Sequence, residues 1–218
     1  MNKILDNKSL RFLETKLVKK LSEYEIFQDP QINVSPRAIG DTVQEKIGEI
    51  LPSCFETGMI DEFNSNFARR SMEDVAFYDK DGNYYAVDIK THNLSTDFNM
   101  PNLISVERLA RFYRDDKNYF VILLIEYEVR NGELRFTDAH FVPIEHIEWS
   151  CLTIGALGWG QIQIANSNRV DVNRGNTRVN WMLSLCDVMD LFYPREINKI
   201  NERIEYFHTV RAFWENKK

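Results

Sequence analysis

Apolar side chains recur at helical spacing in the first part of the chain. Between residues 9 and 27, Leu and Val side chains lie three or four positions apart, with Lys and Glu between them. Ser35-Pro36 then has the form of an N-cap followed by proline at the first helical position. It opens a second apolar stripe that ends near Leu51. The pattern predicts two amphipathic helices, over 9–27 and 36–51.

The next part of the chain has the spacing of strands. Residues 74–78 and 84–90 are apolar runs, and the segment between them, Asp79-Lys80-Asp81-Gly82-Asn83, is a strong turn signal. These features predict a β-hairpin. Because Asp74 begins the first strand and Asp88 lies near the end of the second, we expect the hairpin to bring these two aspartates together.

The pattern then changes to a helix and a buried strand. Pro101 precedes a helical pattern over 102–114, and the near-continuous apolar run 119–129 is typical of a strand buried on both faces. Asn131-Gly132 turns this strand into another, over 134–142. Strand, helix, buried strand is the order of a crossover between parallel neighbours. We therefore expect an α/β fold with a mixed central β-sheet flanked by helices.

The remaining sequence continues this fold without a linker or repeat. A Gly-rich stretch over 155–164 leads into a polar segment over 165–180, and the apolar spacing predicts two final helices, 181–193 and 194–216, separated at Pro194. We expect a single domain over 1–218, with its core over about 35–145 and C-terminal helices over 181–216.

Composition and net charge only partly restrict the class of protein to which this chain can belong. Hydrophobic residues make up 44% and charged residues 28%, as in ordinary globular proteins. The net charge of −6 does not indicate nucleic-acid binding, but three arginines gather between Asn166 and Trp181. The odd number of cysteines (Cys54, Cys151 and Cys186) favours free buried thiols. With no signal peptide or membrane-length apolar run, we expect a cytoplasmic protein that does not contact membranes.

The hairpin carries the candidate chemistry. Asp88 and Lys90 are two positions apart, so on a strand they share a face, and Asp74 comes to the same place. A solvated strand face with a weak ion pair is the simpler interpretation. However, apolar elements on both sides should bury this strand, and buried charges need partners or a metal. Paired carboxylates beside a lysine suit a divalent-metal site for phosphodiester hydrolysis.

These residues resemble a known motif. Glu73-Asp74…Asp88-Ile89-Lys90 is similar to the PD-(D/E)xK nuclease motif, with Glu73 where proline is usual. The run Asp-Ile-Lys-Thr is similar to the active-site strand of the EcoRV-like group. Segments 40–45, 91–93 and 101–105 resemble segments found in type II restriction endonucleases. The resemblance covers about 35–125 and implies a restriction-endonuclease-like fold and a Mg²⁺-dependent enzyme. Such an enzyme cuts double-stranded DNA at specific sequences and leaves 5′-phosphate ends.

The resemblance also implies roles for individual residues. Asp74, Asp88 and the main-chain carbonyl of Ile89 would hold Mg²⁺, and Lys90 would lie beside the attacking water and the scissile phosphate. A further acidic ligand often comes from the preceding helix. Glu45 is the preferred candidate, with Glu49 and Gln44 left open.

DNA recognition is expected outside this hairpin. Asn and Gln can read adenine, and Arg can read guanine, in the major groove. The segment over about 155–180 is dense in such side chains, although a polar surface loop would also explain it. The candidate recognition residues are Asn166, Asn168, Arg169, Asn173, Arg174, Asn176 and Arg178. Near the catalytic strand, His92, Asn102 and Ser105 are candidate DNA contacts, the last two at an expected helix start that would favour phosphate. Trp159 could stack or wedge into DNA, but core packing is favoured.

The symmetry of the expected DNA site suggests the oligomeric state of the protein. Two-fold symmetric proteins match palindromic DNA sites, so we expect a homodimer that joins through the N-terminal helix or the final helices. Two alternatives stay open. One is a structure-specific nuclease of the same fold, of the junction-resolvase or repair type, and the other is a non-catalytic DNA-binding or protein-interaction module.

Overall fold

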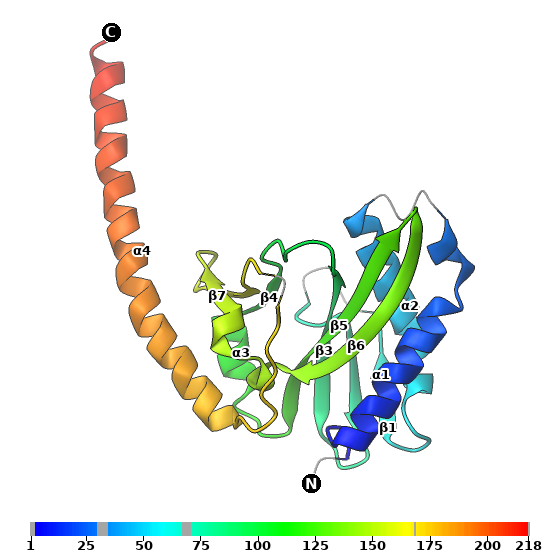
Figure 1. Ribbon diagram of the computed structural model, residues 1–218. Coiled ribbons are helices and arrows are strands. Elements are labelled where there is room, and N and C mark those ends of the chain that lie inside the picture. The colour runs from blue at the N-terminus through cyan, green and yellow to red at the C-terminus, as the bar shows by residue number, and fades with distance from the viewer. Residues whose placement is uncertain (1–2, 30–34, 67–70, 168, 218) are drawn as a thin grey trace. The chain divides into compact units, whose positions relative to one another are not determined.

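A five-stranded mixed sheet forms the centre of the fold (Figure 1). The computed structural model of the protein describes residues 3–29, 35–66, 71–167 and 169–217. The strands lie in the order β1-β2-β3-β5-β6, with β3 and β5 parallel and the other neighbours antiparallel. They are β1 (Ile60–Asn64), β2 (Val75–Asp79), β3 (Tyr84–Asn93), β5 (Asn118–Arg130) and β6 (Glu133–Pro143). The predicted mixed sheet flanked by helices is therefore confirmed.

Two helices supply the apolar core on one face of this sheet. The leucines of α1 (Asn7–Ser22) and the aliphatic residues of α2 (Pro36–Cys54) form one buried cluster with alternate residues of β3 and β5, such as Val87 and Leu123. Figure 1 shows both helices on the same side of the strands. The predicted N-cap is present, because the Ser35 hydroxyl accepts a hydrogen bond from the Ala38 N–H. The first helix is shorter than expected, since it ends at Ser22 and a 3₁₀ turn, η1 (Glu25–Gln28), follows it.

The predicted turns and crossover are confirmed. The Asp79 carboxylate accepts hydrogen bonds from the N–H groups of Asp81 and Asn83, and Gly82 has a φ of +74°, so this segment closes the β2–β3 hairpin. Asn131 and Gly132 both have positive φ, as a tight hairpin turn between β5 and β6 requires. The parallel pairing of β3 with β5 is the expected crossover.

The segment after Pro101 corrects one prediction. Residues Asn102–Ser105 form β4 rather than the start of a helix, and α3 covers only Val106–Phe112. The reason is pairing, because β4 adds to a second sheet in the order β4-β8-β7, with β8 at Gln161–Ile164 and β7 at Leu152–Gly155. Two 3₁₀ turns, η2 (Ile144–His146) and η3 (Trp149–Cys151), lead from β6 into this sheet.

The chain divides into two compact units, Met1–Asn173 and Arg174–Lys218. The second unit consists mainly of one helix, α4 (Arg178–Glu215). The expected break at Pro194 is wrong, because α4 runs through it. Proline lacks an N–H and removes one backbone hydrogen bond, but the helix bonds on either side continue. The Thr177 hydroxyl accepts from the Asn180 N–H, so the helix also begins earlier than predicted.

The structure bears on two further expectations, the state of the cysteines and the absence of a membrane-spanning segment. Cys54 and Cys151 are free and buried as expected, whereas Cys186 on α4 is free and exposed. In the part of the chain that the structure describes, no helix has the length and apolarity needed to cross a membrane.

Candidate active site

The hairpin brings Asp74 beside β3 at the position of Asp88. The Asp74 N–H donates to the Val87 carbonyl at 2.9 Å, which extends the β2–β3 ladder by one residue. One oxygen of the Asp74 carboxylate, Oδ2, accepts from the Ile89 N–H at 2.7 Å. The side chain therefore folds back over β3 rather than extending into water. Asp74 and Asp88 are close as predicted, because strand alternation and the turn together fix their positions.

Lys90 completes a group of charges, which we call the Lys90 cluster (Asp74, Asp88 and Lys90), in which Asp88 is buried and the other two are partly buried. Its Nζ lies 2.6 Å from Asp88 Oδ1, and the two side chains are only 20% and 10% exposed. On β5, the residues level with Asp88 and Lys90 are the apolar Ile122 and Leu124. Apolar neighbours remove water from this face, so the ion pair forms in a poorly solvated place.

The second oxygen of Asp88 is left without a partner. Asp88 Oδ2 is buried and accepts no hydrogen bond from any described residue. A buried carboxylate oxygen in this state costs free energy unless a cation or a proton satisfies it. Burial accordingly raises the pKa of Asp88 to about 7, since the nearby charge of Lys90 offsets only part of the desolvation and Asp74 raises the pKa further. Burial also raises the pKa of Asp74, against the opposing effects of the Ile89 N–H and Lys90.

The donor atoms at this place fit a hard divalent cation. Asp74 and Asp88 supply carboxylate oxygens, and the Ile89 carbonyl lies 3.5 Å from Lys90 Nζ in the same cluster. No set of three or more His, Cys, Asp and Glu side chains arranged to hold a metal occurs among the described residues. Mg²⁺ is commonly held by one or two carboxylates with water and substrate oxygens as the other ligands. Two carboxylates and the partnerless Asp88 oxygen meet that requirement.

The helix residue that reaches this cluster is Gln44, not Glu45. The Gln44 side-chain N–H donates to Asp74 Oδ1 at 2.6 Å. Asp74 is thus held on one side by α2 and on the other by β3.

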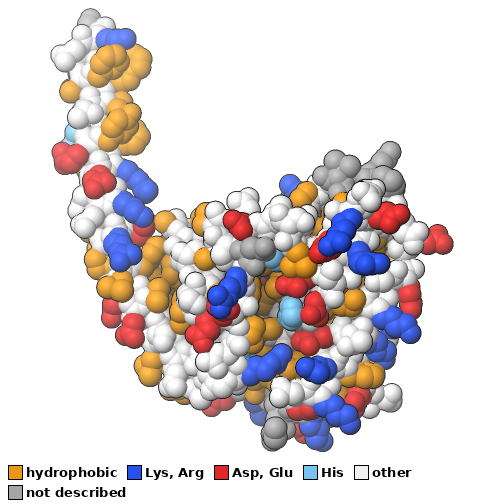
Figure 2. All heavy atoms as spheres, viewed as in Figure 1, with side chains coloured by type: hydrophobic (Ala, Val, Ile, Leu, Met, Phe, Trp, Pro, Cys, Tyr) orange, Lys and Arg blue, Asp and Glu red, His pale blue; other side chains and the backbone are white. Residues whose placement is uncertain are grey.

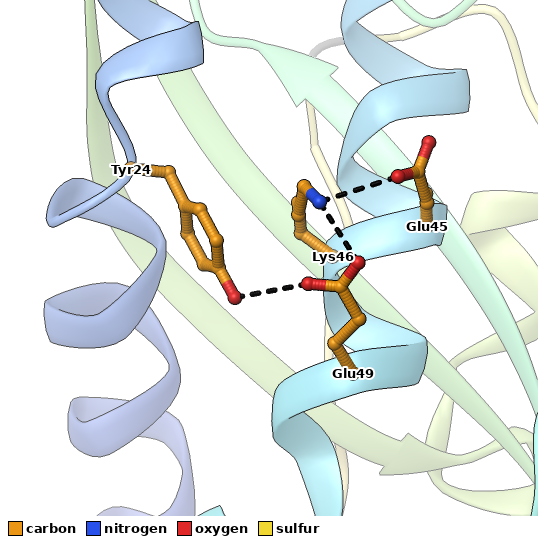
Figure 3. A network of polar contacts seen from close by, with 4 residues as sticks. All are labelled: Tyr24, Glu45, Lys46 and Glu49. Atoms are coloured by element: carbon orange, nitrogen blue, oxygen red, sulfur yellow. Dashed lines mark hydrogen bonds and ion pairs between the residues drawn. The ribbon is translucent and has the colours of Figure 1, made fainter.

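Glu45 and Glu49, the acidic alternatives for the fourth ligand, lie in a different network (Figure 3). Lys46 Nζ is 3.2 Å from Glu45 and 2.8 Å from Glu49, and the Tyr24 hydroxyl donates to Glu49 at 3.2 Å. We call Glu45, Lys46 and Glu49 the Lys46 cluster. Its carboxylates are exposed, at 68% for Glu45 and 48% for Glu49.

His92 is buried, which disfavours the DNA contact expected for it. Only 4% of the residue is exposed, its Nε2 lies 3.0 Å from the Thr96 carbonyl, and its ring stacks on Phe98 with centroids 3.8 Å apart. These contacts hold the loop after β3 in place, so a structural role is favoured.

The other two candidates near the catalytic strand are more accessible. Asn102 is exposed on β4, where its Oδ1 accepts from Gln163 at 2.7 Å. Ser105 caps α3 by accepting from the Arg108 N–H. Only Ser105 is therefore at a helix start, which corrects the placement of Asn102.

The candidate recognition residues are divided between the two units. Asn166 and Arg169 are exposed in the first unit, and Arg169 forms an ion pair with Asp171. Asn173 donates to Glu148 at 2.8 Å. Arg174, Asn176 and Arg178 belong to the second unit, where Arg178 is the first residue of α4. Asn168 lies outside the described residues.

Trp159 is exposed, contrary to the core packing favoured from the sequence. It lies between Gly158 and Gly160, both with positive φ, and is 64% exposed rather than packed in a core. The exposed indole leaves the stacking role open.

Comparison with known proteins adds no assignment. No family model matches this chain, and a search of curated proteins finds no similar sequence. The chemistry of the Lys90 cluster is therefore the strongest guide to function.

Proposed function

We propose that this protein is a Mg²⁺-dependent, sequence-specific type II restriction endonuclease with a PD-(D/E)xK active site. The observation that carries the proposal is the buried Asp88 carboxylate, which has one oxygen on Lys90 and the other without a partner. A solvated strand face would leave neither oxygen buried. The order α2, β1–β3, α3, β5, with β3 antiparallel to β2 and parallel to β5, is compatible with this superfamily and supports the proposal.

The side chains present can perform the required steps. Asp74, Asp88 and the Ile89 carbonyl would hold Mg²⁺, which when bound lowers the pKa of a coordinated water and offsets charge on phosphate oxygens. Gln44 and the Ile89 N–H orient Asp74 for this task. The Lys90 amino group lies next to Asp88, where it can stabilise negative charge that develops on the scissile phosphate. Hydrolysis would leave 5′-phosphate and 3′-hydroxyl ends.

Recognition of the DNA sequence is assigned to the polar segment over about 155–180. Asn166, Asn168, Arg169 and Asn173, together with Arg174, Asn176 and Arg178, are the proposed contacts to base edges and backbone. Adenine suits the Asn side chains and guanine suits the Arg side chains. A homodimer on a palindromic duplex site is the matching assembly.

The test is cleavage of plasmid DNA by the purified full-length chain. With Mg²⁺ we expect discrete bands, and sequencing of the ends gives the site and the cleavage position. EDTA and Lys90→Ala should each abolish the bands, whereas Lys46→Ala, from the exposed cluster, should not. A smear, or cleavage only of branched substrates, would favour the structure-specific nuclease. Absence of Mg²⁺-dependent cleavage on any duplex or branched DNA would reject the catalytic proposal.

A further inference from the structure

The C-terminal half of α4 presents a continuous apolar stripe. Large apolar side chains follow one another at alternating steps of three and four residues, the spacing that keeps one face of a helix apolar over many turns. The stripe consists of Tyr193, Ile197, Ile200, Ile204, Phe207 and Trp214, with Arg211 at the one intervening position. These apolar residues are between 40% and 65% exposed. Figure 2 shows hydrophobic side chains near the C-terminal end of this helix, with charged side chains along its middle on the side in view.

Such exposure calls for a partner surface. Contiguous apolar patches beyond roughly 600 Å² are rare on monomers and mark interaction sites. From Tyr193 to Trp214 the stripe runs about 33 Å along the helix at 1.5 Å per residue. This length is about three heptads, close to the minimum that sustains a two-helix coiled coil. The spacing matches another helix with the same repeat better than a globular surface.

Charges on the stripe favour one orientation of a self-pair. Asp190 and Arg211 both occupy stripe positions and are exposed. Parallel pairing in register would place Asp190 against Asp190 and Arg211 against Arg211, which is repulsive. Antiparallel pairing about a two-fold axis between Asn198 and Lys199 instead places Asp190 level with Phe207 of the second copy. The stripe charge of the second copy that lies nearest to Asp190 is then Arg211, one helical turn further along.

The residues that flank the stripe agree with this register. In it, Ile197 packs level with Ile200 of the second copy, and the flanking Glu196 lies beside Arg203 of the second copy. Within one helix these two residues are seven positions apart, too far to pair with each other. Glu196 also contacts Lys199 of its own helix at 2.7 Å.

We propose that α4 pairs with α4 of a second copy of this chain, antiparallel, through the part of the stripe from Asp190 to Phe207. The interface is isologous, so it closes into a dimer rather than a fibre. This proposal stands without nuclease activity, because it depends only on the sequence and exposure of α4.

The first test is the mass of the full-length chain in solution, by sedimentation equilibrium without DNA or Mg²⁺. We expect a dimer. Phe207→Glu should raise the dimer Kd about 30-fold or more, the usual effect of losing an apolar anchor and here of placing a second carboxylate beside Asp190 of the second copy. Tyr206→Glu is the matched control, since Tyr206 is 63% exposed and Phe207 65%, but the adjacent residue points about 100° away from the stripe. It should leave the Kd within about threefold.

The second test is a charge exchange that reports orientation. Glu196→Arg and Arg203→Glu should each weaken the dimer, and the double variant should restore it, because only antiparallel pairing brings these positions together. A monomeric wild-type chain, or a dimer that Phe207→Glu leaves intact, would overturn the proposal. A dimer that the stripe variant disrupts but the double charge variant fails to restore would overturn the antiparallel register. Circular dichroism of each variant verifies that the fold is retained.

Discussion

Two lysines in this protein each lie beside carboxylates, and it is the carboxylates whose surroundings differ. The lysine side chains are similarly buried, 17% exposed for Lys46 and 20% for Lys90, but the partners of Lys46 are exposed, whereas Asp88, the partner of Lys90, lies on a buried strand face. The hydrogen bond from Lys46 lowers the pKa of Glu49, so that carboxylate stays ionised. Burial dominates at Asp88 and raises its pKa in spite of a lysine at 2.6 Å.

The difference shows that burial, more than the number of charges, decides which cluster can do chemistry. The carboxylates of the Lys46 cluster are satisfied by water and by their neighbours, and a cation would gain little there. The Asp88 carboxylate is held in a place that disfavours its charge, and a divalent ion would relieve that cost.

The largest expected effect is on DNA cleavage. Lys90→Ala should lower the rate of plasmid cleavage by at least about 10²–10³-fold, the usual loss when one charge-stabilising group is removed from an active site. Lys46→Ala removes an equivalent lysine from the exposed cluster and should change the rate less than about twofold. Single-turnover cleavage rates with Mg²⁺ compare the two variants, and circular dichroism verifies that both are folded. Equal losses in the two variants would contradict the distinction between the clusters.

The next effect is on the pH dependence of stability in the metal-free protein. The pKa of Asp88 is raised from an ordinary value of 3.8 to about 7, so between these values the folded state holds a proton that the unfolded state releases. The free energy of unfolding should therefore fall as pH rises from about 4 to about 7. This loss is at most about 4 kcal/mol, and above pH 7 it is complete.

Asp88→Asn tests this prediction because it removes the titrating group. In urea unfolding with EDTA at pH 5 to 8, the variant should lose most of the slope that the wild type shows. Mg²⁺ should raise the stability of the wild type at pH 8 and have little effect on the variant. A wild-type curve that rises with pH over this range would show that Asp88 is ionised in the folded metal-free protein.

The sequence predicted this cluster because its positions depend on local rules. The alternation of β3 places Asp88 and Lys90 on one face, and the Asp79–Asn83 turn sets the register that brings Asp74 to them. One remaining error arises from pairing between distant segments, and another from the local effect of a proline. Asn102 joins a strand because Gln161–Ile164 offers an edge to it, and α4 continues through Pro194 because one lost hydrogen bond does not end a long helix.

The choice between Gln44 and Glu45 was decidable from the sequence. The apolar stripe of α2 contains Val43 and Ile47, and each residue advances about 100° around the helix. Gln44 therefore borders the stripe that faces the sheet, whereas Glu45 lies nearly opposite it. Acidic character favoured Glu45, but helix geometry favours its neighbour. How α2 crosses the sheet, which the sequence does not specify, then brings Gln44 rather than Glu49 to Asp74.

A moderate effect is expected from Gln44. Gln44→Ala removes the hydrogen bond that holds Asp74 and should lower the cleavage rate by about tenfold, as for residues that orient metal ligands. Glu45→Ala is the adjacent control and should stay within about twofold of the wild type. The Mg²⁺ concentration for half-maximal cleavage should rise in the first variant only. A large loss of cleavage rate in Glu45→Ala would instead indicate that Glu45 is the fourth ligand.

The smallest expected effect is in the exposed cluster itself. Glu49→Gln removes a carboxylate whose pKa is lowered, first of all by the hydrogen bond from Lys46, so its contribution is present above the ordinary pKa of 4.5 and lost as pH falls through the lower folded value. This pH dependence is opposite in sign to that of Asp88. Because solvent and salt screen the pair, the urea midpoint at pH 7 should hardly move. A destabilisation as large as the Asp88 effect, persisting in 0.5 M salt, would show that exposure does not separate the two clusters.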